Sequence, residues 1–461
     1  MNTPVENFHH ALQFKYDLCI GCSHCTGVCP TGAIHVDKGR PILDPNRCID
    51  CGRCFLICPV NAIYIEQDDF QTIYNYKCPV LLVPSLFSAQ FHERINQRAI
   101  LSAIYNLGFK YIFEVEKSVE VIKQIITKNV TENHGKQPII STFCPAIVRL
   151  IQVKFPSLIN NLFLIKPPLD LTALYIKKSL TEKGYSEQDI GIFYVAPCAA
   201  KIAAIKSPVG EEMSPITGVI NMNYFYNKVL RVIKQGEYKL SNQEDDFHRL
   251  PKNSLLWALT GGEISLLEQG RNLAVDEVHN VSDFLEKLEN EELEGIDFLE
   301  LRACDESCAG GILCAANRFL IAERQRNRAK NCSNAVSHKD NELLDYVDYL
   351  TQNMQVRGEI QPRSIDKLDD NMAIAMRKMK QAFELNAELP QVDCRICGYQ
   401  TCKALADAIV RGDADLKQCI FIQRMLEQTD KLTTAEALKI MKSIWGEKKV
   451  DINLTRHLNL E

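Results

Sequence analysis

The sequence predicts an α/β protein with mostly parallel sheets, preceded by a small duplicated cysteine-rich domain and followed by a small helical one. Three observations favour this fold class. Apolar segments such as VLLVPSL, KYIFEV and DIGIFYVA alternate with helical stretches, which is typical of parallel sheets covered by helices. One cysteine motif occurs twice near the N-terminus, and another cysteine group follows a charged helical region near the C-terminus.

Length and composition set the outer limits. A chain of 461 residues corresponds to about three domains at roughly 150 residues each, and we place them at 1–76, 77–375 and 376–461. A net charge of −5 gives no indication of nucleic-acid binding. The longest apolar runs are far shorter than the ~20 residues that cross a bilayer. The N-terminal segment lacks the pattern of a secretory signal, so we expect a cytoplasmic protein.

Nineteen cysteines dominate the composition. Most of them stand close together, in a large chain without a signal segment. Such spacing lets several thiolates converge on one metal ion or cluster and suits a disulfide framework poorly. The cysteines therefore predict metal centres.

The first two cysteine groups share one spacing. CIGCSHCTGVCP at 19–30 and CIDCGRCFLICP at 48–59 both read C-x2-C-x2-C-x3-C-P, so the motif repeats after 29 residues. This spacing is that of bacterial two-cluster ferredoxins, in which the fourth cysteine of each run serves the other cluster. A pair of zinc sites is the alternative, but zinc motifs seldom hold four cysteines this close before a proline. We therefore assign one [4Fe–4S] cluster to Cys19, Cys22, Cys25 and Cys58 and another to Cys48, Cys51, Cys54 and Cys29.

Three loops in the middle of the chain carry the next cysteines. Cys144 follows PIISTF, Cys198 follows DIGIFYVAP, and Cys304 and Cys308 follow IDFLELRA. A single buried cysteine is more often a small core residue than a ligand. Loops at the carboxyl ends of parallel strands, however, build the site of such a sheet, and small residues around the last pair permit a cofactor to approach closely. Together the four thiolates predict one more cluster in a buried pocket.

STFCPAI, APCAAK and RACDESCAGG resemble, in order, the three signature motifs of the [FeFe]-hydrogenase catalytic domain, and the resemblance covers nearly the whole chain. It implies a two-lobed catalytic domain behind the ferredoxin-like domain. It also implies that Cys144, Cys198 and Cys304 ligate a [4Fe–4S] cubane, and that Cys308 bridges this cubane to a diiron unit with CO, cyanide and a dithiolate. Lys201 would hydrogen-bond a cyanide, since an ammonium suits a buried anionic ligand, so Cys308 and Lys201 are the implied catalytic residues. The alternative for Lys201 is a solvated surface lysine.

The sequence departs from the efficient members of that family where protons are handled. Phe143 stands where they have a proton-relaying cysteine, and a phenyl ring neither donates nor accepts a proton. Ala196 and Ala204 replace a methionine and a glutamate, and the helix VIKQIITKN, which usually supplies further carboxylates, has none. A positioned acid or base is worth roughly 10²–10⁴ in rate, so we expect slow turnover and a resemblance to the sensory branch of the family. Glu263 and Glu306 are alternative proton carriers, although an ordinary solvated acid is the simpler interpretation of each.

The last cysteine group reads C-x2-C-x4-C-x16-C. Cys394, Cys397 and Cys402 lie in CRICGYQTC, and the amphipathic KALADAIVRGDADL returns the chain to Cys419. Four cysteines could hold zinc. CGYQTCKALADAI, however, resembles the small [4Fe–4S] domain often appended to redox proteins, so we favour a [4Fe–4S] cluster.

These assignments leave three cysteines and define the cofactors. We expect Cys78 to be structural, Cys314 to lie near the bridging cysteine and Cys332 to be exposed. The expected cofactors are four [4Fe–4S] clusters and, after maturation, the diiron unit.

Two functions are compatible with this reading of the sequence. The first is an oxidoreductase resembling [FeFe]-hydrogenase, which interconverts H2 with protons slowly and serves H2 or redox sensing. The second is a non-enzymatic electron-transfer or iron–sulfur assembly protein without the diiron unit. The first implies H2, protons, the maturation proteins that install the diiron unit, and an unidentified redox protein as partners. We expect neither nucleic acid nor a membrane as partner, and a homodimer is compatible with the sequence.

Overall fold

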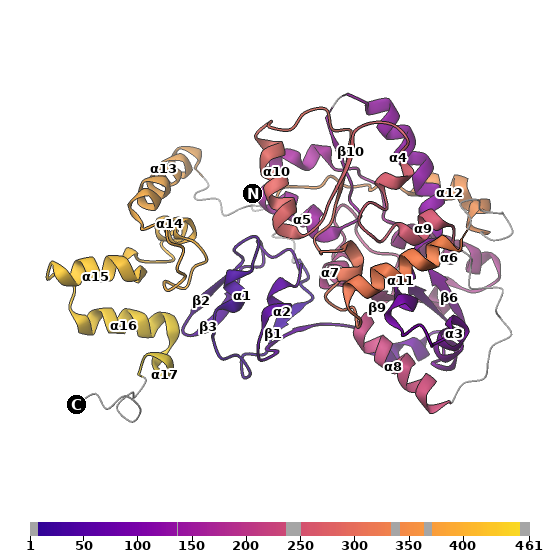
Figure 1. Cartoon of the computed structure of the whole chain (residues 1–461), viewed down its shortest axis with the longest axis horizontal. Coiled ribbons are helices and arrows are strands. Elements are labelled where there is room, and N and C mark those ends of the chain that lie inside the picture. Colours follow the sequence, from indigo (N-terminus) through magenta and orange to yellow (C-terminus); the bar gives the residue numbers. More distant parts are fainter. Residues whose placement is uncertain (1–7, 136, 237–249, 333–341, 364–370, 452–461) are drawn as a thin grey trace. The chain divides into compact units, whose positions relative to one another are not determined.

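The computed structural model describes residues 8–135, 137–236, 250–332, 342–363 and 371–451. Contacts within the chain group these residues into two compact units. The large unit takes the residues up to Leu12, 49–52 and 65–362, and the small unit takes 13–48, 53–64 and the residues from Arg363 onward. The small unit thus combines segments from both ends of the chain (Figure 1). The predicted domain limits after residues 76 and 375 stay a prediction.

Two parallel sheets form the centre of the large unit. One has the strand order β6-β5-β8-β9 and the other the order β10-β11-β7, and every pairing in both sheets is parallel. Strands β5 and β8 are buried at every residue, which explains why they read as continuous apolar runs. The predicted α/β class with parallel sheets is confirmed. The strands are β5 (Cys78–Val83), β6 (Tyr111–Glu114), β7 (Ile139–Ile140), β8 (Ile190–Ala196), β9 (Gly218–Asn221), β10 (Asn272–Val275) and β11 (Phe298–Leu301).

Helices connect and cover these strands. Apolar side chains of α5 and α10 pack with those of β11 into one core. No helix in the described part of the chain combines the length and the apolar character needed to cross a membrane. The helices of the large unit are α3 (Gln97–Asn106), α4 (Val119–Asn133), α5 (Pro145–Lys154), α6 (Pro168–Glu182), α7 (Ala199–Lys206), α8 (Met222–Gln235), α9 (Lys252–Leu256), α10 (Val278–Glu289), α11 (Arg318–Lys330) and α12 (Val347–Asn353).

The two N-terminal cysteine runs share one backbone conformation. Each contains a short helix, α1 (His24–Gly27) or α2 (Arg53–Ile57). Strand β1 pairs with β4, and β2 pairs with β3 in an antiparallel hairpin. The strands are β1 (Leu12–Phe14), β2 (Ile34–Asp37), β3 (Arg40–Leu43) and β4 (Ile63–Ile65). Left-handed backbone conformations recur at the 29-residue period, in the pairs Gly21 and Asp50, Ser23 and Gly52, and Gly32 and Asn61.

The C-terminal part of the small unit is helical, as predicted. Gly412 ends α14 in the left-handed conformation that glycine adopts without strain. The side chains of Thr433 and Glu436 form a reciprocal capping box at the start of α16, which satisfies backbone N–H groups at that helix end. The helices are α13 (Met372–Glu388), α14 (Cys402–Arg411), α15 (Ile420–Gln428), α16 (Thr434–Trp445) and α17 (Glu447–Val450).

Candidate functional site

The three cysteine loops of the large unit converge. Cys144 stands between β7 and α5, Cys198 between β8 and α7, and Cys304 and Cys308 follow β11. The carboxyl ends of parallel strands therefore deliver all four thiols to one place. Burial raises the pKa of Cys304, and the charges of the other three cysteines raise it further. All four cysteines are only partly buried, as expected for thiols that line a space inside the protein.

Lys201, in the first turn of α7, carries a positive charge into this group. Its Nζ lies 3.3 Å from the Cys308 Sγ, and the residue is only 9% exposed. Burial alone would lower the pKa of Lys201, but the neighbouring charges, that of Cys308 first, outweigh burial and raise it. The alternative of a solvated surface lysine is therefore wrong.

Phe143 closes one side of the site. Its buried ring meets Trp257 edge to face, with 5.8 Å between the ring centroids. Two cations flank the ring: Lys201 Nζ lies 4.4 Å and Arg302 Cζ 4.2 Å from its centroid. Such cation–π contacts hold a ring in place more firmly when they are desolvated. Phe143 is thus fixed by charge as well as by packing, and it offers no atom that exchanges protons.

Arg302 connects Phe143 to a buried acidic network. It forms ion pairs with Glu263 and, at 3.6 Å, with Glu300. Glu263 also accepts a hydrogen bond from the Ser141 hydroxyl at 2.8 Å. Burial raises the pKa of Glu300 to about 7, although Arg302 acts to lower it. The interpretation of Glu263 as a solvated acid is wrong, because this residue is 2% exposed.

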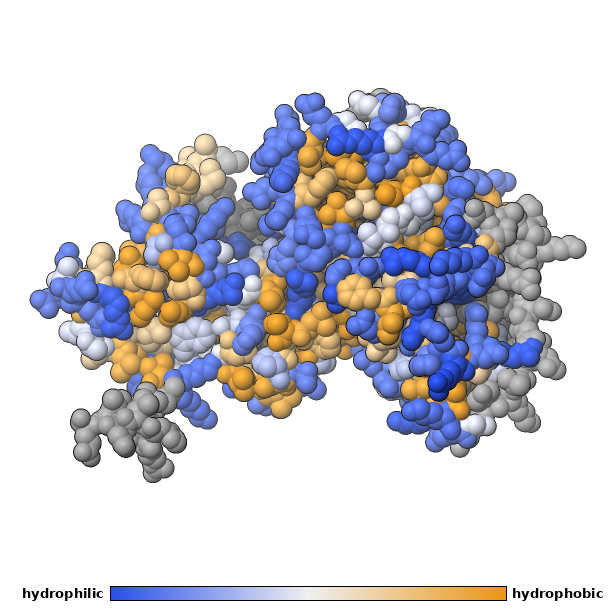
Figure 2. Space-filling view, viewed as in Figure 1, coloured by the Kyte–Doolittle hydropathy of each residue, from blue (hydrophilic) through white to orange (hydrophobic). Residues whose placement is uncertain are grey.

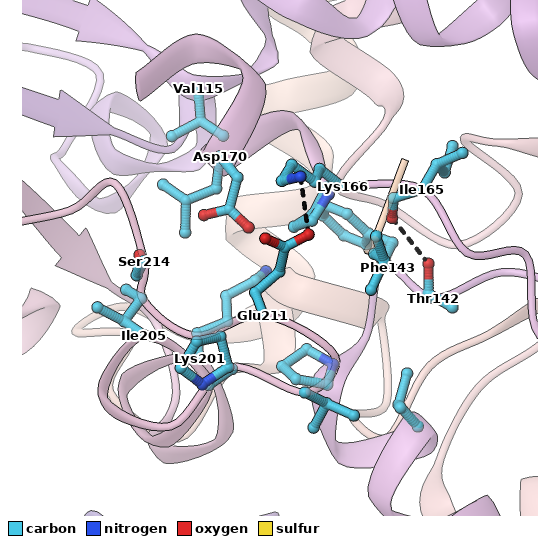
Figure 3. A pocket seen from close by; sticks show the side chains of 18 of the residues that line it. Val115, Thr142, Phe143, Ile165, Lys166, Asp170, Lys201, Ile205, Glu211 and Ser214 are labelled. Atoms are coloured by element: carbon cyan, nitrogen blue, oxygen red, sulfur yellow. Dashed lines mark hydrogen bonds and ion pairs between the residues drawn. The ribbon is translucent and has the colours of Figure 1, made fainter. Parts of the chain in front are cut away.

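A cavity of about 120 Å³ adjoins Lys201 and, of the four site cysteines, Cys308. Figure 3 shows the carboxylates of Asp170 and Glu211 near each other in this cavity, with Lys166 paired to Glu211 at 2.8 Å. Burial raises the pKa of Asp170 to about 7, against the opposite effect of Lys166. Burial likewise raises the pKa of Glu116 to about 7. The charged or reactive lining comprises Glu116, Lys166, Asp170, Lys201, Glu211 and Cys308.

Sequence reasoning missed the acids of the cavity. Glu116 follows β6 after a single intervening residue, so the rule that sites form at strand ends could have found it. Asp170 lies in α6 and Glu211 in a loop, with no motif that links them. Only the fold brings these side chains to one cavity.

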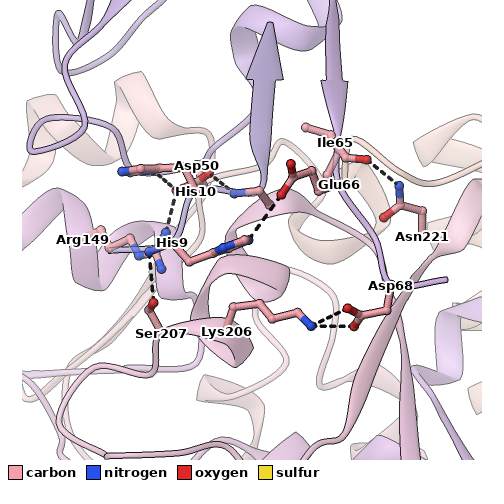
Figure 4. Close-up of polar contacts among 11 residues, drawn as sticks. His9, His10, Asp50, Ile65, Glu66, Asp68, Arg149, Lys206, Ser207 and Asn221 are labelled. Atoms are coloured by element: carbon pink, nitrogen blue, oxygen red, sulfur yellow. Dashed lines mark hydrogen bonds and ion pairs between the residues drawn. The ribbon is translucent and has the colours of Figure 1, made fainter. Parts of the chain in front are cut away.

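Residues 49–52 of the second cysteine run belong to the large unit. The Asp50 carboxylate attaches them to it. This carboxylate is fully buried and accepts hydrogen bonds from Arg149 Nη1 at 2.7 Å and the Ala11 N–H at 3.1 Å. His10 Nδ1 lies 2.7 Å from it, and Figure 4 shows these groups around Asp50. Arg149 belongs to α5, the helix that starts directly after a site cysteine. Cys51 is thereby placed near enough to the site for its charge to act on Cys304.

The ferredoxin-type cysteines of the small unit surround a cavity of their own. Its four cysteines are Cys19, Cys22, Cys25 and Cys58. Crossed ligation assigns the same set to one cluster. Equivalent backbone groups donate to the fourth sulfur of each run: the Ala33 N–H to Cys29 Sγ and the Ala62 N–H to Cys58 Sγ, both at 3.2 Å.

The C-terminal cysteines also come together. Cys397, Cys402 and Cys419 are buried in one apolar cluster, whereas Cys394 is exposed. Burial raises the pKa of Cys397 to about 11, and the charges of the other three cysteines act in the same direction. The ligand roles of all these cysteines stay a prediction.

The remaining candidates have mainly structural surroundings. Cys78 is fully buried in β5, as predicted. Cys314 Sγ donates to the backbone carbonyl of Cys308 at 3.6 Å, close to the site as expected. Cys332 is only partly exposed, because its thiol folds back onto a carbonyl of α11 at 3.4 Å. Glu306 pairs with an arginine of α11 at 3.0 Å and lies outside the buried network.

Three family models match this chain. The model of the C-terminal domain of the iron only hydrogenase large subunit matches residues 79–264. A model of 4Fe-4S dicluster domains matches residues 18–62, and a model of an Fe-S cluster segment matches residues 389–421. The last two matches include all the cysteines of their regions, whereas the hydrogenase match includes Cys144 and Cys198 and ends before Cys304 and Cys308.

Individual relatives are distant. Iron hydrogenase 1 of Clostridium pasteurianum is 25% identical over 252 residues, which are 52% of this chain and 41% of the hydrogenase. An uncharacterized protein of Methanocaldococcus jannaschii is 36% identical over 74 residues, 16% of this chain and 32% of that protein. The chain therefore spans less than half the length of these curated relatives. A solved variant of the [FeFe]-hydrogenase HydA1 from Chlamydomonas reinhardtii is 14% identical with a TM-score of 0.47, covering 61% of this chain and 94% of that one.

Replacing Asp50 should destabilise the large unit strongly. Asp50→Ala removes the carboxylate that faces the fully buried guanidinium of Arg149, and breaking such a pair costs about 3–5 kcal/mol. Urea denaturation measures the free energy of unfolding. Asp283→Ala, at an exposed position of α10, is the control and should change it by no more than about 0.5 kcal/mol. Equal effects of the two substitutions would contradict a structural role for the ion pair.

Asp170→Asn should alter the pH dependence of stability. Burial raises the pKa of Asp170 from 3.8 to about 7 on folding, so this carboxyl destabilises the folded state increasingly as the pH rises between these values. The asparagine variant should therefore gain stability over the wild type across this range, with a constant gain above about pH 7. Urea denaturation of both proteins at several pH values tests this, and a difference in stability that stays the same from about pH 4 to about pH 8 would contradict it.

Proposed function

We propose that this [FeFe]-hydrogenase-like protein, with an N-terminal ferredoxin module and a C-terminal iron–sulfur module, interconverts H2 with protons and electrons at the cysteine site of the large unit. Turnover is slow, and the protein serves H2 or redox sensing. The contact between Lys201 and Cys308 at the edge of the cavity carries the proposal, because a buried cation next to one thiol suits an anionic metal ligand at that point.

The residues of the site fit the cofactor that the family implies. Four thiols from three loops supply the ligands, with Cys144, Cys198 and Cys304 for the cubane and Cys308 as the bridge to the diiron unit. The cavity beside Cys308 and Lys201 provides space next to the bridging thiol. When bound, the diiron unit supplies the metal centre at which H2 is split or formed. Burial raises the pKa of Cys198 to about 11, so its thiol is protonated when no metal is bound. Because metal ligation requires the thiolate, binding of the cofactor would release this proton.

The side chains around the site account for slow proton traffic. Phe143 and Trp257 fill the side of the site toward the acids of the buried network. Glu263 is held there by an ion pair with Arg302 and by a hydrogen bond from the Ser141 hydroxyl. Proton transfer by a positioned group is worth roughly 10²–10⁴ in rate, so the absence of an exchangeable proton at Phe143 is expected to lower turnover by a factor in this range.

Electrons have a route away from the site. Cys51 of the second ferredoxin-type run belongs to the large unit, as Cys304 does, so the cluster that Cys51 would ligate is the proposed relay for electrons of the cubane. The C-terminal module offers an outlet to a redox partner protein, since Cys394 is exposed. A protein that senses H2 has to pass electrons to a partner protein, and it can do so even when turnover is slow.

The alternative function is an electron or iron–sulfur carrier without a diiron unit. A carrier needs the cubane cysteines alone. The carrier function gives no role to Lys201, which is buried beside Cys308, or to the cavity that both residues line. These two features favour the hydrogenase-like function.

Maturation with the diiron cofactor tests the proposal. The wild-type protein should show infrared bands of bound CO and cyanide together with slow H2 turnover. Cys308→Ser should lose both, because the bridge to the diiron unit is missing, while Cys332→Ser applies the same chemical change outside the site and should retain both. A matured wild-type protein without these bands would leave only the carrier function.

A thiol at position 143 should accelerate turnover. Phe143→Cys supplies a group that exchanges protons, whereas Phe143→Ala removes the ring without replacing its chemistry. Both variants lose buried aromatic packing at a cost of about 3–5 kcal/mol, so they are compared with each other and normalised to the infrared bands. We expect H2 turnover of the cysteine variant to exceed that of the alanine variant by up to ~10²-fold. Equal turnover would show that proton transfer at this position is not limiting.

A further inference from the structure

The C-terminal module is hydrogen-bonded to the ferredoxin-type module along the second strand of the small unit. The backbone N–H groups of Val36 and Lys38 donate to the carbonyls of Gly398 and Ser443 at 2.9 and 3.0 Å. The Gly39 N–H donates to the Ile444 carbonyl at 2.8 Å. Main-chain bonds of this kind fix the register between two segments. The C-terminal cysteine loop therefore has one defined position on the ferredoxin-type module.

Two contacts join the cysteine loops of these modules directly. The side-chain amide of Gln400 donates to the backbone carbonyl of Cys29 at 2.8 Å. Gln400 stands between Cys397 and Cys402 in the C-terminal loop. Beside it, the rings of Tyr399 and His35 stack with 5.4 Å between centroids and an interplanar angle of 5°. The Tyr399 N–H in turn hydrogen-bonds to Cys397 and lowers its pKa against the larger effect of burial.

We propose that electrons pass between the cluster that Cys29 ligates and the C-terminal cluster across this contact. The proposal rests on the iron–sulfur part of the proposed function, namely that these cysteines hold [4Fe–4S] clusters, and it is independent of the diiron unit. One electron leaves a reduced [4Fe–4S]⁺ cluster, which becomes [4Fe–4S]²⁺, and converts the other cluster from [4Fe–4S]²⁺ to [4Fe–4S]⁺. No bond forms or breaks in this exchange.

The path between the two cluster sites contains a single non-covalent step. From the Cys29 carbonyl it crosses one hydrogen bond to the Gln400 amide and continues through two residues of chain to Cys402. Electron tunnelling weakens steeply across empty space and much less along covalent and hydrogen-bonded atoms. The Arg395 guanidinium lies against Gly27 of the first run. The hydrogen-bonded path through Gln400, however, leads to the cluster of the second run, because crossed ligation places Cys29 with that run.

The outer side of the C-terminal cluster site is open. Residues 391–395, which include Cys394, are all exposed, and Figure 2 shows apolar side chains at the surface of the small unit around α14 and α15. Phe421 and Met425 of α15 are 45% and 51% exposed. Electrons that reach this cluster are thus accessible to an oxidant in solution.

Electron paramagnetic resonance of the full-length, cluster-loaded protein reduced with titanium(III) citrate tests which clusters are neighbours. The C-terminal cluster is identified as the signal that Cys397→Ala removes, and in the wild type it should be split by a neighbouring spin. Cys54→Ala, which removes the Cys29-ligated cluster, should abolish this splitting. Cys25→Ala, the equivalent change in the first run, should leave it in place. Splitting that survives Cys54→Ala, or disappears in Cys25→Ala, overturns the proposal.

A kinetic measurement tests the hydrogen bond without removing any ligand. The reduced protein is mixed with oxidised cytochrome c, and reoxidation of the ferredoxin-type clusters is followed. Gln400→Ala should slow this reoxidation severalfold, because the hydrogen-bonded step is lost. Gln391→Ala, which changes an exposed glutamine of the same module, should have no effect. Amide hydrogen exchange at Val36 confirms that the module stays docked, and equal rates in the two docked variants overturn the proposal.

Discussion

The buried ion pair between Asp50 and Arg149 is the constraint that joins residues 49–52 of the second cysteine run to the rest of the large unit. Removing a carboxylate and a guanidinium from water costs several kcal/mol each unless further hydrogen bonds satisfy them, and the backbone of Ala11 and the ring of His10 supply such partners for Asp50. Because Arg149 belongs to the helix that starts after Cys144, the pair holds residues 49–52 in a fixed position relative to Cys144.

Buried charged side chains surround the four thiols of the site. Burial raises the pKa of Cys304, and the negative charges of neighbouring thiolates raise it further. Lys201 and Arg302 bring positive charge to this group, and the ring of Phe143 lies between them. The ring separates the lysine at the cavity from the arginine that binds the buried carboxylates.

Local sequence patterns predicted the parts of this molecule that depend on neighbours in the chain. The cysteine spacings indicated the cluster loops, and buried apolar runs indicated the parallel strands. Glu263 was misjudged because its burial depends on a partner, Arg302, that only the fold brings to it. Asp170 carries no motif and acquires its raised pKa from packing alone. The sequence also did not predict that residues 49–52 belong to the large unit, because the motif that contains them is typical of an independent ferredoxin domain.

The duplication within the ferredoxin-type module has a consequence for reduction potentials. These potentials respond to hydrogen bonds at sulfur, to net charge and to solvent exposure. The backbone hydrogen bond to the fourth sulfur is matched between the copies, since Ala33 and Ala62 donate over the same distance. The copies carry different residues at all three left-handed positions, and at one of them the difference is a charge: the first copy has Gly21 and the second has the ion-paired Asp50. The charge of Asp50 beside the second loop is therefore a difference that would separate the potentials of two clusters held by the same backbone conformation.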